Sequence, residues 1–168
     1  MISVEKLETK RLDIVPLTED LMDLWLHNIG RMEEVMNCDY QAEPMSDWFR
    51  DIVAGQLRAV RLYPDDILWN TFWFLIRRSD KKVVGSIVFK GPPDDNGIVE
   101  IGYGTGADHR GKGYMTEAVA AVCAWALRQK GVCHVSAESD ADNPASRRIL
   151  EKCGFKEISA GETIWWRL

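Results

Sequence analysis

A glycine-rich segment with two basic side chains has the composition of an anion-binding loop. Residues 102–114 read Gly-Tyr-Gly-Thr-Gly-Ala-Asp-His-Arg-Gly-Lys-Gly-Tyr, between an expected strand and the longest expected helix. Glycines let successive backbone N–H groups converge on one anion, and a helix N-terminus adds about half a positive charge at the same place. Arg110 and Lys112 add cationic side chains. The segment predicts a diphosphate site, and the plainer alternative is a glycine-rich turn that binds nothing.

Two common phosphate-binding motifs fit this segment poorly. Gly106 to Lys112 has the G-x-x-x-x-G-K spacing of nucleotide-hydrolysing loops, but Gly113 stands where Ser or Thr must hold magnesium. Gly102-x-Gly104 begins a dinucleotide fingerprint, yet the expected helix starts too far downstream and the preceding strand belongs to a meander, not to a βαβ unit. Neither motif identifies the ligand.

Carboxylates on two expected strands are candidates for a general base. Glu100 lies in an otherwise apolar strand, on the face of Ile98 and Gly102, where either a solvated sheet face or a base explains it. Glu138, at the end of the next strand, is the second candidate. His109 is a weaker one, because it flanks the loop where phosphates are expected.

A serine on a short helix is the other candidate for chemistry. Ser146 shares one helical side with Ile149, Leu150 and Cys153, and this side is expected to face inward. A buried helical serine often bonds only to the preceding turn, so a structural role is as plausible as a functional one. Asn143 is the expected N-cap of this helix.

Composition bounds the class of protein. With 168 residues, 46% of them hydrophobic, the chain is expected to form one domain over residues 1–168. A formal charge of −5 argues against sequence-independent binding of nucleic acid or of an anionic membrane. Charges interrupt the first 15 residues, so we expect neither a secretory signal nor a membrane span, and a cytoplasmic protein. The spacing of the cysteines and histidines predicts no metal site.

The hydrophobic period changes along the chain and predicts a mixed α/β fold. In the first half of the chain we expect a strand at 11–15, a helix from Thr18 to Gly30, an irregular stretch at 31–45, and a helix from Ser46 to before Pro64, whose apolar stripe includes Trp48 and Ile52. Strands are expected next at 70–77, 83–89 and 98–103. A helix at 115–127, a strand at 132–138, a short helix after Asn143, and strands at 155–158 and 163–167 complete the chain. They predict a mostly antiparallel central sheet of about six to seven strands flanked by helices.

The loop and three further segments resemble one enzyme family. His109 to Ala118 is similar to the acetyl-coenzyme A (acetyl-CoA) loop of the GCN5-related N-acetyltransferases (GNAT), whose pattern is Arg/Gln-x-x-Gly-x-Gly/Ala before a long helix. Arg110 and Gly113 match, whereas Met115 replaces the final small residue, a change we expect to be tolerated because that position contributes chiefly a backbone N–H. The segments 7–12, 99–103 and 142–155 resemble the RimJ/RimL-type branch, which acetylates protein N-termini and various small amines.

The resemblance implies where the cofactor lies. The fourth and fifth strands of the sheet would splay apart, with the pantetheine arm in the gap. A backbone N–H near residues 101–103 would stabilise the oxyanion, Glu100 and Ser146 would be catalytic, and the Ser146 hydroxyl would contact the thioester sulfur. Leu150 stands where many members carry a tyrosine acid, which costs little because a thiol with a pKa near 8.5 leaves readily. The implied cofactor-binding residues are Tyr103, Gly104, Thr105, Arg110, Gly111, Lys112, Gly113, Tyr114, Met115, Asn143 and Ser146.

The expected function is therefore acetyl-CoA-dependent transfer of an acetyl group to a primary amine, either a protein or peptide N-terminus or a small amine. The alternative is a non-catalytic acyl-CoA-binding regulatory domain, and Glu100 and Ser146 favour the enzyme. Acidic residues of the irregular stretch, Glu43 among them, would meet a cationic amine or form a solvated loop. The expected partner is the amine-bearing acceptor, with no nucleic acid and no membrane, and a homodimer is left open.

Overall fold

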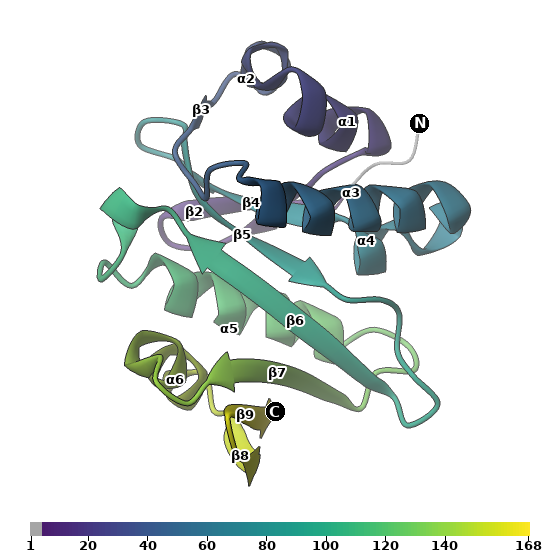
Figure 1. The fold of residues 1–168 in the computed structure, drawn as a ribbon, viewed down its shortest axis with the longest axis vertical. Helices are drawn as coiled ribbons and strands as arrows, with labels where there is room; N and C mark the ends of the chain where they lie inside the picture. The colour runs from purple at the N-terminus through teal and green to yellow at the C-terminus, as the bar shows by residue number, and fades with distance from the viewer. Residues whose placement is uncertain (1–4) are drawn as a thin grey trace.

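A twisted sheet with helices on both faces forms the framework of the computed structural model, which describes residues 5–168 (Figure 1). The strands in this part of the chain are β1 (Leu7–Glu8), β2 (Leu12–Pro16), β3 (Asp39–Tyr40), β4 (Phe72–Arg77), β5 (Lys82–Phe89), β6 (Ile98–Thr105), β7 (His134–Asp140), β8 (Lys156–Ala160) and β9 (Thr163–Arg167). The helices are α1 (Glu19–His27), α2 (Ile29–Met36), α3 (Asp47–Leu62), α4 (Ile67–Asn70), α5 (Tyr114–Leu127) and α6 (Pro144–Lys152). The sheet order is β1-β2-β4-β5-β6-β7-β9-β8, and β3 adds to β5.

Alternation along the strands divides the core into two layers. On β4, Trp73 and Leu75 pack with α5 on one face of the sheet, whereas Phe72 and Phe74 pack with α1 and α3 on the other. This is the period of two that a strand imposes on its side chains. Both faces of β4 and β5 are buried, which explains why their sequences are dense apolar runs.

The mixed, mostly antiparallel sheet confirms the predicted fold class, and the structure corrects four details. The first helix does not end at Gly30, because Asn28 ends α1 and then caps α2 by accepting a hydrogen bond from the Arg31 backbone N–H. The stretch 31–45 is therefore not wholly irregular, since α2 and β3 lie in it. Two-residue strands raise the number of strands in the described residues to nine. Trp48 is 70% exposed and Ile52 is 37% exposed, so neither belongs to the buried stripe of α3, which consists of Phe49, Val53, Leu57 and Val60.

The sheet opens between β6 and β7. These strands pair in parallel only from Ile98 to Ile101 on β6, although β6 runs on to Thr105 and β7 to Asp140. Figure 1 shows the two arrowheads pointing apart, with α6 beyond the end of β7. On its β5 side, β6 stays paired as far as Thr105, but the backbone N–H and C=O groups of residues 102–105 that point toward β7 have no strand partner and are free to pair with an extended ligand. None of the helices in residues 5–168 is long and apolar enough to cross a bilayer.

Candidate active site

The start of α5 is anchored to the N-terminal strand region by one partly buried carboxylate. The Glu117 side chain is 16% exposed. It accepts hydrogen bonds from the Thr9 hydroxyl at 2.7 Å, from the Arg11 backbone N–H at 2.8 Å and from Arg11 Nε at 2.8 Å. Arg11 also donates to the carbonyl of Lys112 at 2.9 Å and lies over the ring of Tyr114. These contacts fix the loop that precedes α5.

The N-terminus of α5 is open and lies beside a hollow. Gly113 precedes the helix at φ 81° and has no capping side chain, and Gly111 is also left-handed, at φ 74°. The first N–H groups of an α-helix have no partner within the helix, so they are available to an anion here. The hollow, of about 330 Å³, is lined by Thr105, His109, Gly111, Gly113, Met115, Thr116, Ala145, Arg148, Ile149 and Lys152. Two of these, on α6, are cationic, which suits a diphosphate.

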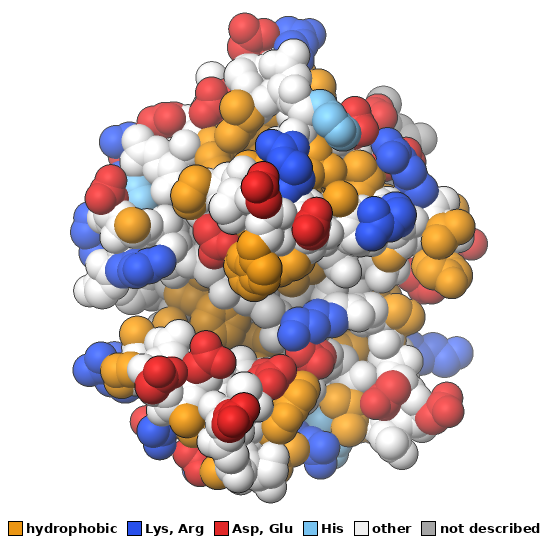
Figure 2. Space-filling model, viewed as in Figure 1, with side chains coloured by type: hydrophobic (Ala, Val, Ile, Leu, Met, Phe, Trp, Pro, Cys, Tyr) orange, Lys and Arg blue, Asp and Glu red, His pale blue; other side chains and the backbone are white. Residues whose placement is uncertain are grey.

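A larger cleft lies on the other side of the opening between β6 and β7. It has a volume of about 490 Å³ and is lined by Glu43, Trp48, Phe49, Ile52, Phe72, Ser86, Val88, Lys90, Ile101, Gly102, Tyr103, Gly104, Glu138, Ser139, Asp140, Asn143 and Ser146. Figure 2 shows it as a hollow across the molecule, with hydrophobic side chains inside and acidic side chains along its lower rim. Both hollows border α6 and the end of β6, so one elongated ligand would reach both.

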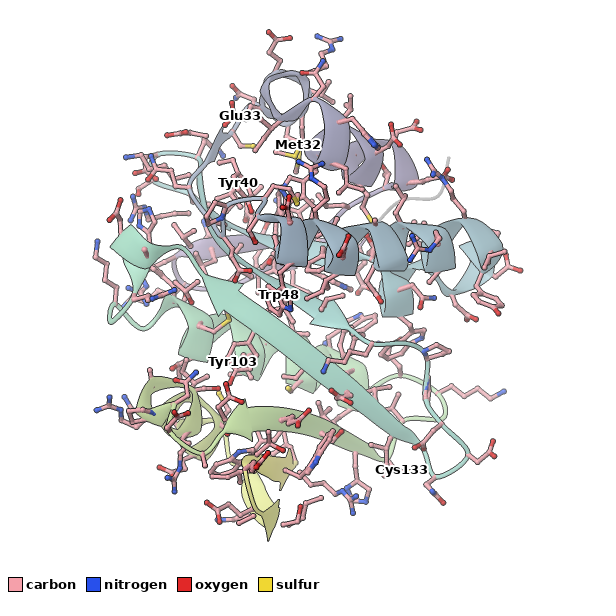
Figure 3. The ribbon with its side chains drawn as sticks, viewed as in Figure 1. Met32, Glu33, Tyr40, Trp48, Tyr103 and Cys133 are labelled. Atoms are coloured by element: carbon pink, nitrogen blue, oxygen red, sulfur yellow. The ribbon has the colours of Figure 1, made fainter. Side chains whose placement is uncertain are left out.

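Two hydroxyl groups meet where the cleft passes between β6 and α6. The Tyr103 hydroxyl lies 2.7 Å from Ser146 Oγ, and Figure 3 shows Tyr103 extending from β6 toward α6. Burial raises the pKa of Tyr103 to about 12, against the hydrogen bond to Ser146, so the phenol keeps its proton at neutral pH. Asn143 caps α6 by accepting a hydrogen bond from the Ser146 backbone N–H. One proton of the pair lies between the two oxygens, so the pair supplies one free hydroxyl donor to the cleft.

The two predicted base candidates have different surroundings. Register places Glu100 opposite Ser136, so Glu100 and Glu138 lie on the same face of the sheet where β6 and β7 part. Glu138 is exposed and borders the cleft. Glu100 forms an ion pair with Lys90 and does not border the cleft itself.

A carboxylate from the segment before α3 also borders the cleft. Glu43 Oε1 lies so close to β6 that a Cβ on Gly104 would come within 2.5 Å of it, so any larger residue there would require the Glu43 side chain to move. Burial raises the pKa of Glu43, and the charge of Arg110 opposes this in part. A base with a raised pKa is typical of functional sites, but sequence reasoning gave Glu43 only as one acid of a loop. Nothing in the local sequence shows that this loop reaches β6.

His109 lies at the loop and not at the cleft. It is buried, and its Nε2 is 2.8 Å from Gln41 Oε1. Burial lowers the pKa of His109, and the nearby charges of Arg77 and Lys112 add to the effect. A neutral imidazole that gives its Nε2–H to Gln41 leaves Nδ1 as an acceptor without a partner in the described residues.

The structure brings most of the predicted cofactor residues to the two hollows. Tyr103, Gly104, Asn143 and Ser146 border the cleft, and Thr105, Gly111, Gly113 and Met115 border the hollow at α5. The Met115 side chain is buried, with its end close to Gly85. Tyr114 is buried and its hydroxyl accepts a hydrogen bond from Arg77, which gives its side chain a structural role. Arg110 and Lys112 are exposed on the loop. Sequence reasoning missed Ser86, Lys90, Asp140, Arg148 and Lys152.

Comparison with known proteins adds a family and a fold. A family model described as an acetyltransferase (GNAT) domain matches residues 11–156. The uncharacterized N-acetyltransferase YjdG of Bacillus subtilis (strain 168) is 31% identical over 150 residues, which cover 89% of this chain and 88% of YjdG. The acetyl transferase of Salmonella typhimurium that modifies the N-terminal serine of 50S ribosomal subunit protein L7/L12 shares the fold, with a TM-score of 0.67, 14% identity and 98% of each chain covered. RimL, a ribosomal L7/L12 alpha-N-protein acetyltransferase in complex with coenzyme A, has a TM-score of 0.69 at 12% identity, over 98% of this chain and 97% of that chain.

Proposed function

Because the chain belongs to the GNAT acetyltransferase family, we propose that it transfers an acetyl group from acetyl-CoA to a primary amine, on a peptide N-terminus or a small molecule. The observation that carries the proposal is the opening between β6 and β7, which lies between a cationic hollow at the N-terminus of α5 and a deep cleft. A single extended molecule with a phosphate end and a reactive end suits this arrangement. The predicted family is confirmed, and RimL, from the predicted branch, shares the fold.

The residues on either side of the opening fit acetyl-CoA. Bound there, it would supply an acetyl group on a thiol leaving group. Backbone N–H groups of residues 111–115, with Arg148 and Lys152, would hold its phosphates, and the unpaired backbone of residues 103–105 would pair with its arm. Of the hydrogen-bonded hydroxyls of Ser146 and Tyr103, the one that accepts from the other keeps its own proton and would donate it to the sulfur end. Gly113 supports this fit, since its φ of 81° turns the chain so that the start of α5 is uncovered.

A base must prepare the amine. An alkyl ammonium with a pKa near 10.4 is neutral so seldom at pH 7 that its use costs about 4.6 kcal/mol, and an α-amine near 7.8 costs about 1 kcal/mol. Glu138 borders the cleft and has no side-chain partner within residues 5–168, whereas Lys90 already engages Glu100. We therefore propose that Glu138 accepts the proton and that Glu100, our first candidate from the sequence, positions Lys90.

Calorimetry and a thiol assay test the function together. Acetyl-CoA should bind with measurable heat, and free thiol should appear when peptides, polyamines, aminoglycosides or amino acids are added. Binding without thiol release across this panel would favour the non-catalytic alternative, and absence of binding at millimolar acetyl-CoA would refute the proposal.

Two matched variants then separate the base candidates. Glu138→Gln should lower kcat roughly a hundredfold or more and leave the affinity for acetyl-CoA unchanged. Glu100→Gln should have a smaller effect on kcat. The reverse order would return Glu100 to the role of base.

A further inference from the structure

The cleft is lined by more carboxylates than the single base that the acetyl transfer requires. We propose, on the basis of the function proposed above, that the acceptor is an amine with a second positive charge on a short apolar spacer, an alkyl diamine or polyamine. Glu43 and Asp140 would hold the second cation, while Glu138 serves the reacting amine. The second positive charge of the acceptor would thus be bound by side chains that take no part in the acetyl transfer.

The carboxylates of the cleft are not neutralised by the protein. Within residues 5–168, the side chains of Glu43, Glu138 and Asp140 have no hydrogen bond and no ion pair, and all three border the cleft. Lys90 is the one cationic side chain among the lining residues in that part of the chain, and Glu100 neutralises it. Arg110 is close enough to Glu43 to influence its pKa, but Arg110 lies on the loop proposed to hold phosphates. The net charge that faces an acceptor is therefore negative.

A buried hydroxyl and an aromatic side chain complete the site. Ser86 is 3% exposed and borders the cleft, and its hydroxyl has no hydrogen-bond partner in the described residues, so it is available to accept from an ammonium N–H. Trp48 borders the same cleft with 70% of its surface exposed, unusual for a tryptophan without a partner. Figure 3 places it at the start of α3, facing β6. Tryptophan rings attract cations and pack against methylene groups.

The same charges disfavour the other classes of acceptor. The carboxylate of an amino acid would meet Glu43 or Asp140 as a like charge. An acceptor with an uncharged group in place of the second ammonium would leave the carboxylates of Glu43 and Asp140 without a partner. In the reaction the N–C bond forms and the C–S bond breaks. Of the two protons that the reacting ammonium loses, one leaves through Glu138 to solvent and the other ends on the thiol, while the second ammonium group keeps its charge.

Three acceptors of equal length test the proposal: 1,4-diaminobutane, 4-aminobutan-1-ol and 4-aminobutanoate. We expect kcat/KM for the diamine to exceed that for the amino alcohol by about tenfold or more, because charge-assisted hydrogen bonds replace neutral ones. The amino acid should be the poorest acceptor. Calorimetry on the protein saturated with coenzyme A should give the same order of affinity without any turnover.

Variants assign the preference to the cleft. Asp140→Asn and Glu43→Gln should each reduce the ratio of diamine to amino alcohol severalfold, and Trp48→Ala should weaken binding of the diamine more than Trp48→Phe does. Asp95→Asn removes the same charge from an exposed turn and should leave the ratio unchanged. For a variant with altered turnover, the affinity for the diamine is measured by calorimetry, which does not depend on catalysis.

The outcomes distinguish this inference from the function beneath it. Equal kcat/KM for the diamine and the amino alcohol would overturn the inference. A higher kcat/KM for a peptide that begins with serine and has no charged side chains would also overturn it. Either result would leave the transferase function intact. Coenzyme binding without thiol release from any acceptor would instead refute the proposed function.

Discussion

Replacement of Glu117 by glutamine should destabilise the protein and loosen the proposed phosphate site. Glutamine keeps the shape but puts an amide NH₂ where one carboxylate oxygen now lies. It can still accept from Thr9 and from the Arg11 backbone N–H, but its NH₂ group would then face Arg11 Nε, which needs an acceptor. A hydrogen bond to a charged group contributes about 1.5 to 3 kcal/mol, so the loss should be about 2 kcal/mol. The carbonyl of Lys112, held by the same guanidinium, should become less constrained.

Urea denaturation at pH 7 measures the effect, with Glu151→Gln on the exposed side of α6 as the matched control. Burial alone would raise the pKa of Glu117, but the Thr9 hydroxyl and the Arg11 donors outweigh it and hold the pKa below its ordinary value. A carboxylate with a lowered pKa stabilises the folded state above its unfolded pKa, and this contribution is lost as the pH falls through the folded value. The difference between wild type and variant should therefore shrink below about pH 4. A difference under about 0.5 kcal/mol at pH 7 would mean that the network behaves as an exposed ion pair and would refute this reasoning.

Three further changes are predicted. Gly113→Ala forces a non-glycine residue to φ 81°, with its Cβ about 3.3 Å from Arg11 Nη2, so it should cost about 1 kcal/mol or more in urea denaturation and weaken coenzyme A binding by calorimetry; unchanged values for both would contradict the assignment of the loop. Ser146→Ala and Tyr103→Phe should each lower kcat with little change in KM for the acceptor, and full activity in both would remove the hydroxyl pair from the mechanism. Because burial lowers the pKa of His109, stability should fall as the pH drops below about 6.5, where the unfolded state takes up the proton. His109→Gln should flatten this part of the stability profile, and an unchanged slope would show that another group titrates.

The strands and long helices were predictable because their residues repeat with the period of the element. The apolar runs of β4 and β5 and the stripe of α5 extend over enough residues to identify the element, and α5 begins within one residue of the predicted position. The helix α2 has apolar residues at helical spacing, Ile29, Met32, Val35 and Met36, but it is only eight residues long and contains Gly30, which was read as a helix stop, so it was missed. Gly30 was taken as a helix end, but Asn28 performs this role by capping both helices.

The two halves of the site differ in how far sequence could predict them. The phosphate side lies in one continuous segment, where glycine spacing and the following helix are visible in the sequence. The acceptor side is assembled from α3, β5, β7 and the segment before α3, so its composition depends on tertiary packing. Trp48 illustrates the limit, since its position on the helical period predicted burial, whereas its side chain borders the cleft and is exposed. Lys90 likewise forms an ion pair with Glu100, which makes Glu100 a weaker candidate for the base, and no local sequence pattern predicts this contact.

Titration of the ¹⁵N-labelled protein with coenzyme A, followed by NMR of the backbone amides, tests directly where the phosphates bind. We expect the largest shifts on residues 111–116, with a second group at 103–105. Shifts confined to other parts of the chain, or none at millimolar coenzyme A, would contradict the claim that the start of α5 holds the phosphates.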